Sequence, residues 1–177
     1  VRAAGGDRVA VYDLENGQGT PIYVHAKVCV IDDVWAAVGS DNLNRRSWTH
    51  DSELSAAVLD ETRDEREPRD PAGLGDGARV FARELRLRLW REHLGRGPDE
   101  DGDLLDPVEG FDAWRLTAAA LQAWHDAGRH GPRPPGHAVE HDPGRVRPWA
   151  AWWANPVYKL LIDPDGRPRQ LRRAGRF

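Results

Sequence analysis

The sequence contains one cysteine, no methionine and only two lysines, Lys27 and Lys159. A single cysteine excludes an internal disulfide and a metal site of the Cys-x-x-Cys type. Because a translation product normally begins with methionine, a chain that starts at Val1 and lacks this residue is expected to be a piece of a longer protein. All other basic residues are arginine. This bias is typical of GC-rich bacterial genes, so we expect a bacterial origin.

Long hydrophobic runs and an excess of positive charge are also missing. No apolar run approaches the ~20 residues that a membrane-spanning helix needs. The net charge of −4 argues against a protein that coats nucleic acid, whose surfaces are usually basic. With 177 residues, 40% hydrophobic and 31% charged, the composition is that of a globular chain that can bury a core.

The first 60 residues are rich in strand signals. Alternating and β-branched residues predict strands over residues 8–13, 22–31, 35–38 and 53–59. Asp32-Asp33 is expected to form the turn of a hairpin between the second and third of these strands. Residues 40–51 are polar and are expected to be irregular. Residues 60–77 carry several prolines and glycines and are expected to be a solvated loop.

The remainder of the chain reads as helical and irregular. Apolar residues at every fourth position predict a helix over 79–94, which Gly95 ends. A second helix is expected from Pro107 to about Ala127, capped by Asp106. A proline-rich loop over 129–148, a late hairpin formed by residues 157–162 and 164–166 with the residues that follow, and a basic tail should follow. The expected fold is α/β, a mixed β-sheet flanked by helices.

The strand predicted over 22–31 carries two unusual side chains. Alternation places His25, Lys27 and Cys29 on one face and apolar residues on the other. If both faces are covered, the lysine is buried and needs an anionic partner. If the strand lies at an edge, both side chains are simply solvated. The strand by itself leaves these alternatives open, and Cys29 is expected to be a small buried hydrophobe.

A longer run gives the pair a context. The segment YVHAKVCVIDDVWAAVGSDNLNRRSWTHDSELSAAVLD resembles the HxKxxxxDxxxxxxGSxN motif of the phospholipase D superfamily. The HxK pair alone is a weak signal, but the whole run with its spacing is specific. A weaker similarity, to the C-terminal helix of bacterial phospholipase D and cardiolipin synthase-like enzymes, covers residues 87–95. The motif positions are occupied by His25, Lys27, Asp32, Gly39, Ser40 and Asn42, and Asn44 often follows in the family.

The chemistry of the family accounts for these residue types. Cleavage of a phosphodiester needs a nucleophile, a proton donor for the leaving alcohol and stabilisation of charge around phosphorus. One histidine can attack and form a phosphohistidine, while a second protonates the leaving oxygen. Lysine and asparagine side chains donate hydrogen bonds to the phosphoryl oxygens. The resemblance implies that no metal and no other cofactor is required.

The resemblance also assigns a role to each position. His25 is one of two catalytic histidines, and Lys27 and Asn42 bind phosphate oxygens. Ser40 donates a further hydrogen bond to the phosphate or within its loop. Glu53 matches the acidic position that holds the other ring nitrogen of the histidine and fixes its tautomer. The structural positions are Gly39, Asn44 and Asp32, the last bonding the backbone or a nearby arginine.

The family needs two such motifs, but this sequence contains one. None of the other six histidines begins a second HxK. Either the chain is the C-terminal half of a two-motif enzyme, which we favour, or it pairs with a second copy as a homodimer. We therefore expect a catalytic half-domain over 1–95, one half of a pseudo-dimer, and a helical and irregular extension over 96–177. In two-motif members the N-terminal histidine usually attacks, which makes His25 the general acid and base.

The expected function is that of a phospholipase D-like phosphodiesterase that hydrolyses a phospholipid or transfers its phosphatidyl group to an alcohol; the fragment alone should be inactive. The alternatives are a cardiolipin synthase-type phosphatidyltransferase, a nuclease of the superfamily, and an inactive module that keeps the half-site. The expected partners are a phospholipid and the missing half or a second copy, not nucleic acid.

Peripheral membrane contact is an alternative for the end of the chain. The arginines of the basic tail can touch anionic headgroups, and tryptophan favours membrane interfaces. For the tail itself we prefer a solvated or disordered segment. Cytoplasmic and membrane-associated locations both fit. For the Trp149, Trp152 and Trp153 cluster we prefer packing of the C-terminal segment onto the sheet. The tail arginines are Arg167, Arg169, Arg172, Arg173 and Arg176.

Overall fold

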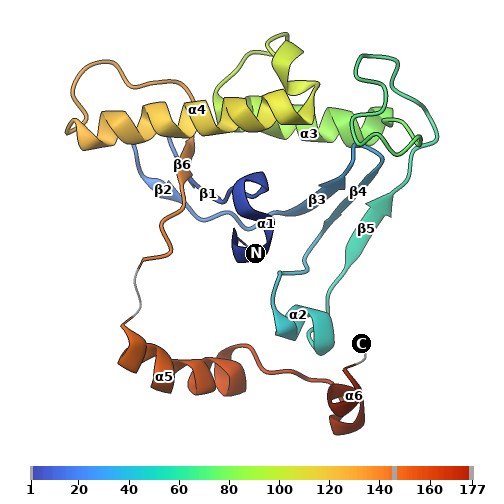
Figure 1. Cartoon of the computed structure of the whole chain (residues 1–177), viewed down its shortest axis with the longest axis vertical. Helices are drawn as coiled ribbons and strands as arrows, with labels where there is room; N and C mark the ends of the chain where they lie inside the picture. The colour runs from blue at the N-terminus through green and yellow to red at the C-terminus, as the bar shows by residue number, and fades with distance from the viewer. Residues whose placement is uncertain (1, 145–146, 176–177) are drawn as a thin grey trace. The chain divides into compact units, whose positions relative to one another are not determined.

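The computed structural model describes residues 2–144 and 147–175 (Figure 1). The chain divides into two compact units. The first comprises the chain up to His25, Cys29–Ala36 and Ala57–Asp142, and the second comprises Ala26–Val28, Ala37–Ala56 and the chain from Pro143 onwards. Helices and strands occur together, so the α/β prediction is confirmed, although the strands form two three-stranded sheets instead of one.

The first sheet has the strand order β2-β1-β6, formed by Pro21–Ile22, Tyr12–Glu15 and Ala138–Glu140. Both pairings are antiparallel, and Leu14 lies opposite Ile22 on one side and Ala138 on the other. A short helix, α1 (Arg2–Gly5), and a 3-10 turn, η1 (Gly6–Arg8), precede the sheet. Strand β6 lies inside the segment that the sequence predicted to be loop, so that prediction is wrong at 138–140.

The second sheet carries the motif and has the order β3-β4-β5, formed by Lys27–Ile31, Trp35–Gly39 and Ser55–Val58. Strands β3 and β4 form the predicted hairpin. Asp32 and Asp33 both have positive φ, 56° and 57°, as a two-residue type I′ turn requires, and the Val34 N–H donates to the Ile31 carbonyl at 3.0 Å. A short helix, α2 (Arg45–Thr49), lies between β4 and β5.

The continuous strand predicted over 22–31 is interrupted. Residue 22 pairs with β1 in one sheet, whereas residues from 27 onward pair with β4 in the other. The chain leaves the first sheet and enters the second between these points, so His25 precedes the strand instead of lying on it. Cys29 is exposed, so the prediction that it is buried is wrong.

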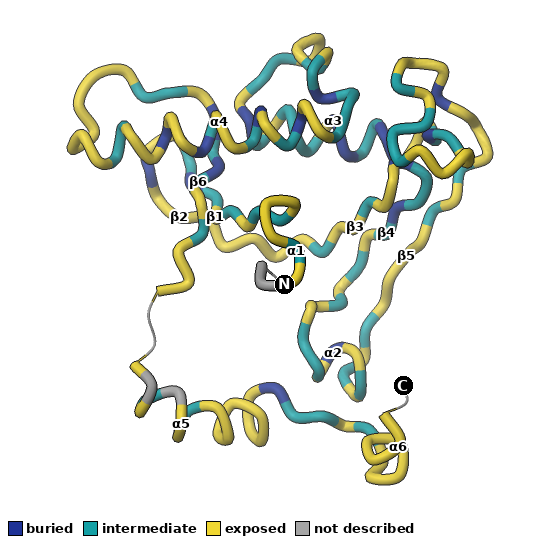
Figure 2. The backbone as a smooth tube through the Cα atoms, viewed as in Figure 1, coloured by how far each residue is buried: buried dark blue, intermediate teal, exposed yellow. Residues whose placement is uncertain are grey.

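The main core lies between two long helices, α3 (Val80–Leu94) and α4 (Pro107–Asp126), with the 3-10 turn η2 (Gly102–Leu104) between them (Figure 2). As predicted, Gly95 ends α3 in the left-handed conformation, and the Asp106 side chain caps α4 by accepting from the Val108 N–H. The buried core residues are Leu87, Leu94, Leu104 and Ala113, and Trp90, Leu105 and Trp114 pack against them.

The end of the described chain is helical. Helix α5 (Pro148–Val157) continues into a π-helical turn, η3 (Tyr158–Ile162), and α6 spans Arg169–Ala174. The predicted late hairpin is therefore wrong. Apolar side chains recur here every three or four residues, which favours a helix, and the π-helical turn follows Pro156, a residue that cannot donate a helical hydrogen bond. Arg176 lies outside the described residues.

Candidate active site

The loop between β4 and β5 is held closed at its base. Gly39 ends β4, where a Cβ atom would lie 2.8 Å from the Leu54 carbonyl oxygen and closer still to Ser55, so only glycine fits without a shift. The Ser40 N–H donates to the Leu54 carbonyl at 3.1 Å, and the Leu54 N–H donates to the Ser40 hydroxyl at 3.0 Å. These two bonds bring Ser40 and Glu53 together.

Ser40 and Glu53 form the best-defined contact of the motif. The Ser40 hydroxyl donates to Glu53 Oε2 at 2.5 Å. This bond lowers the pKa of the Glu53 carboxyl below its usual 4.5, and the positive charge of Lys27 acts in the same direction. Glu53 is therefore ionised at neutral pH. Ser40 donates here within the loop, which is one of the two roles that the sequence left open for it.

Asn42 and Asn44 lie just beyond this contact. The Asn42 side chain is exposed, and the backbone carbonyl oxygen of Asn42 accepts from the Trp48 indole N–H at 2.8 Å. The Asn44 side chain caps α2 by accepting from the Ser47 N–H at 2.9 Å. The loop thus presents an amide that is accessible to a ligand next to one that supports the backbone.

His25 and Lys27 flank the start of β3. The imidazole of His25 is exposed, and its ring centroid lies 6.0 Å from that of Tyr23. Lys27 is the first residue of the strand and is half-buried. The expected pairing of Glu53 with His25 stays a prediction, because the residues belong to different units.

Sequence reasoning missed Asp33. It gave Asp32 an arginine or backbone partner, but Asp32 is exposed, and the buried carboxylate belongs to Asp33. Asp33 accepts from Arg83 Nε at 3.2 Å and from Arg86 Nε and Nη2 at 2.6 and 2.7 Å. Arg86 also donates to the Leu104 carbonyl at 2.6 Å. The sequence signal for this contact was the pair of arginines, Arg83 and Arg86, three positions apart on the predicted helix.

Helix α2 is bound to the C-terminal segment. The Arg46 N–H donates to Asp163 Oδ1 at 2.8 Å, and the Arg45 guanidinium donates to the Asp163 carbonyl. The Gly166 N–H donates to the Thr49 hydroxyl at 2.9 Å. Asp163 is buried by these contacts. Arg46 also pairs with Asp51 at 3.2 Å. A cavity of about 360 Å³ lies here, lined by Leu43, Asn44, Arg45, Trp48, Thr49, Asp163 and Arg167.

The described part of the chain holds neither a cluster of metal-ligating side chains nor a membrane-spanning helix. No group of three or more His, Cys, Asp or Glu side chains within residues 2–144 and 147–175 is arranged to hold a metal ion. Within the same ranges, no helix combines the length and the apolar character required to cross a bilayer.

Comparison with known proteins places the chain in a family. Residues 9–139 match the family described as Phospholipase D. The chain is 38% identical over 103 residues to phospholipase D zeta 1 of Arabidopsis thaliana, which covers 55% of the chain and 9% of that protein. Phospholipase D C of Dictyostelium discoideum is 40% identical over 106 residues, or 55% of the chain and 6% of that protein.

Human phospholipase D1 is 39% identical over 110 residues, which are 59% of the chain and 10% of that protein. The chain thus spans a tenth or less of the length of these relatives. All three come from eukaryotes, so the expected bacterial origin is not confirmed. No solved structure matches. The match covers about three quarters of the sequence and includes every motif position from His25 to Asn44, so the chain belongs to the Phospholipase D family.

Proposed function

We propose that the chain supplies one half of an active site that cleaves phospholipids at the phosphodiester and hydrolyses them or transfers the phosphatidyl group to an alcohol. The observation that carries this proposal is the hydrogen bond from Ser40 to the Glu53 carboxylate inside the motif, which also presents the exposed Asn42 side chain. Lysine and asparagine donors suit phosphoryl oxygens, and an accessible histidine suits proton transfer.

The proposed reaction has two steps. In the first, the imidazole nitrogen of one motif histidine attacks phosphorus, a P–N bond forms and the P–O bond to the headgroup alcohol breaks. The other motif histidine gives its proton to the leaving alkoxide. In the second step this histidine takes a proton from water or an alcohol, whose oxygen attacks phosphorus and releases the first histidine. The products are phosphatidic acid or a new phosphatidyl ester.

We assign the residues of this chain as follows. His25 is the general acid and base, Lys27 and Asn42 bind the phosphoryl oxygens, and Glu53 orients the imidazole of His25 through its other ring nitrogen. Gly39 and Asn44 keep the loop in shape. Ser40 holds the Glu53 carboxylate in place by a hydrogen bond that lowers its pKa.

The second motif has to come from outside this sequence. We propose that it belongs to an N-terminal half of the same enzyme, with a second copy of this chain as the alternative. The chain's share of its relatives' length, a tenth or less, is compatible with both arrangements.

The test is phosphatidyl transfer in a reconstituted enzyme. The chain, alone over a range of concentrations and co-expressed with a first-motif half of a relative, is incubated with phosphatidylcholine or phosphatidylglycerol, with and without ethanol. We expect phosphatidic acid, and phosphatidylethanol when ethanol is present, only when both motifs are supplied. The matched control is the same preparation with His25→Ala.

The products distinguish the alternatives. Cardiolipin formed from phosphatidylglycerol assigns a synthase, and cleavage of DNA but not of lipid assigns a nuclease. Turnover that survives His25→Ala contradicts the proposed site. A well-folded reconstituted enzyme that turns over neither lipid nor DNA is the result expected of an inactive module, and it overturns the proposal.

A further inference from the structure

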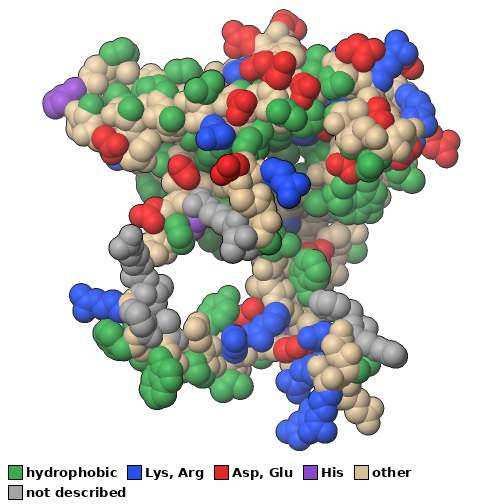
Figure 3. All heavy atoms as spheres, in the orientation of Figure 1, with side chains coloured by type: hydrophobic (Ala, Val, Ile, Leu, Met, Phe, Trp, Pro, Cys, Tyr) green, Lys and Arg blue, Asp and Glu red, His purple; other side chains and the backbone are tan. Residues whose placement is uncertain are grey.

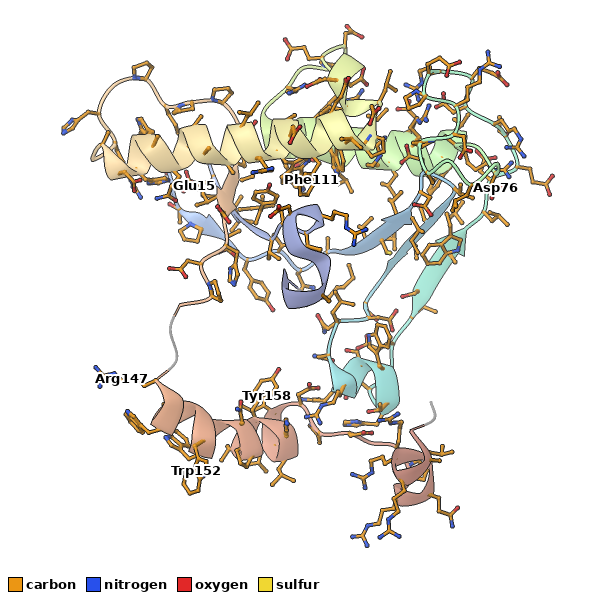
Figure 4. All side chains as sticks on the ribbon, in the orientation of Figure 1. Glu15, Asp76, Phe111, Arg147, Trp152 and Tyr158 are labelled. Carbon is orange, nitrogen blue, oxygen red and sulfur yellow. The ribbon has the colours of Figure 1, made fainter. Side chains whose placement is uncertain are left out.

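Helix α5 has an apolar face that is exposed. Trp149, Trp152 and Trp153 are 63%, 82% and 53% exposed, which contradicts the preferred expectation for this cluster. Figure 4 shows Trp152 projecting from α5. Spacings of three and four residues place one stripe along α5 and η3. It consists of Trp149, Trp152, Trp153, Val157, Leu160 and Leu161, all of them exposed.

The charges that accompany this stripe have one sign. Residues 148–162 contain no acid, and Lys159 is their single charged residue. Helix α6 adds Arg169, Arg172 and Arg173, which lie close enough together to line one small surface hollow. No acid follows Asp165, whose carboxylate already pairs with Arg167 at 2.7 Å. Figure 3 shows hydrophobic side chains over α5 and basic side chains over α6.

The segment is anchored within its own unit. Asp163 lies between η3 and α6 and is 7% exposed. Its carboxylate accepts hydrogen bonds from the Arg46 N–H and from the Arg45 guanidinium. The Gly166 bond to Thr49 adds a second attachment. The apolar stripe and the arginines are therefore fixed to α2, a helix that begins directly after Asn44.

We propose that the segment from α5 to α6, residues 148–174, binds the surface of an anionic phospholipid bilayer. Tryptophan side chains gather at the headgroup level of membranes, and each basic residue near an anionic surface contributes about 1 kcal/mol, or roughly fivefold in affinity. A stripe of tryptophan and aliphatic residues beside a cluster of arginines fits this partner better than an acidic protein surface, which would leave the apolar stripe without a counterpart.

The site lies outside residues 9–139, the part of the chain that matches the family. Binding to a bilayer goes beyond the proposed reaction and does not depend on it, because it requires neither His25 nor a second motif. The two proposals can fail independently.

The first test measures co-sedimentation of the full 177-residue chain with vesicles. Vesicles of phosphatidylcholine containing about 30% phosphatidylglycerol are compared with phosphatidylcholine alone. We expect binding to the anionic vesicles and a blue shift of tryptophan emission. The double variant Trp152→Ala, Trp153→Ala should weaken this binding roughly tenfold or more. The matched control, Val108→Ala with Leu116→Ala, removes equally exposed apolar side chains from α4 and should leave it unchanged.

The second test addresses charge. The triple variant Arg169→Gln, Arg172→Gln, Arg173→Gln should weaken binding to the anionic vesicles by roughly 100-fold and lower its salt dependence. The control for net charge is a second triple variant, in which three arginines outside this segment are changed to glutamine. These are Arg69, Arg88 and Arg115.

Three results would overturn the proposal. One is equal binding by the wild type, the tryptophan variant and the arginine variant. Another is equal loss of binding in the control variants. The third is a stable dimer in sedimentation velocity without lipid that the tryptophan variant abolishes, since the stripe would then be a contact between copies. A His25→Ala chain that still binds vesicles separates a failure of catalysis from a failure of docking.

Discussion

The two ends of the β3–β4 hairpin differ in burial and in what their polar groups contact. At the turn, Asp33 is 2% exposed and its carboxylate is shared by Arg83 and Arg86, both buried. At the open end, Asn42 and Ser40 are exposed, and Glu53 has a pKa that its neighbours lower. The carboxylate at the turn is buried away from solvent, whereas the polar groups at the open end are accessible to a ligand.

This difference shows that one short motif combines a buried structural contact with accessible polar groups. A buried carboxylate is tolerated only when charged and polar partners satisfy it, so the turn end specifies the fold. Groups that bind a phosphate must remain accessible, so the open end contributes less to stability. Substitutions at the two ends should therefore separate activity from stability.

The largest effect is expected from His25→Ala at the open end. Loss of a general acid and base lowers turnover roughly 10²–10⁴-fold in the reconstituted enzyme. Because the imidazole is exposed, the free energy of unfolding should change by less than about 0.5 kcal/mol. Phospholipid turnover and urea unfolding of the same preparation check both statements. A large loss of stability would mean that this end is structural as well.

The opposite pattern is expected from Asp33→Asn at the turn, a change that keeps a residue tolerant of the positive φ. Removing the carboxylate leaves two buried guanidinium groups without it, which should cost about 3–5 kcal/mol of unfolding free energy. Thermal and urea unfolding measure this loss. Asp32→Asn is the control, because the Asp32 side chain is exposed and asparagine tolerates the positive φ of this turn position, so stability should change by less than about 0.5 kcal/mol. Equal losses in the two variants would contradict the assignment of the buried contact to Asp33.

A smaller effect is expected from Gly39→Ala. The added methyl group meets the Leu54 carbonyl oxygen and Ser55, so β4 and β5 have to separate, at a cost of about 1–3 kcal/mol. Gly17→Ala provides the comparison because a Cβ atom there meets nothing within 4 Å. Urea unfolding of both variants tests whether the backbones of β4 and β5 are closely packed at the open end, where the side chains are exposed.

The smallest effect concerns the protonation of Glu53. The pKa of Glu53 in the folded chain lies below 4.5, so the ionised carboxylate stabilises the fold. This contribution is complete when the pH lies above the pKa of Glu53 in the unfolded chain. It is lost as the pH falls through the pKa of Glu53 in the folded chain. Ser40→Ala should move the pKa back up toward 4.5. Carboxyl ¹³C chemical shifts followed during an acid titration measure this change. Ser52→Ala, next to Glu53, should leave the pKa where it is.

The helices and the motif hairpin could be predicted from the sequence because their signals are local. Asp106, Pro107 and Gly95 mark helix ends by their own conformational preferences, and Asp32-Asp33 marks a turn. The break in the strand over 22–31 could not be predicted in this way. It arises because the chain changes its pairing partner from β1 to β4, which residue preferences do not encode.

The candidate site could likewise be predicted where its contacts are local in the sequence and not where they are distant. Family spacing pointed to Ser40, Asn44 and Glu53, and the structure gives each a defined local partner or position. Asp33 was missed because the aspartate that becomes buried is decided by arginines about 50 residues away on α3. The late hairpin was wrong because a Pro-Asp-Gly turn signal was given more weight than the helical spacing of the tryptophans before it.

The Asp163 contacts have a thermodynamic consequence. They join the C-terminal segment to α2, whose first turn the Asn44 side chain caps. Any ligand that favours this conformation of the loop also favours the docked segment, and linkage makes the effect equal in the reverse direction. Ligand binding at the loop after β4 and affinity for a lipid surface, both proposed above, would then be linked by one coupling free energy. Asp163→Asn should reduce this coupling without touching either binding surface.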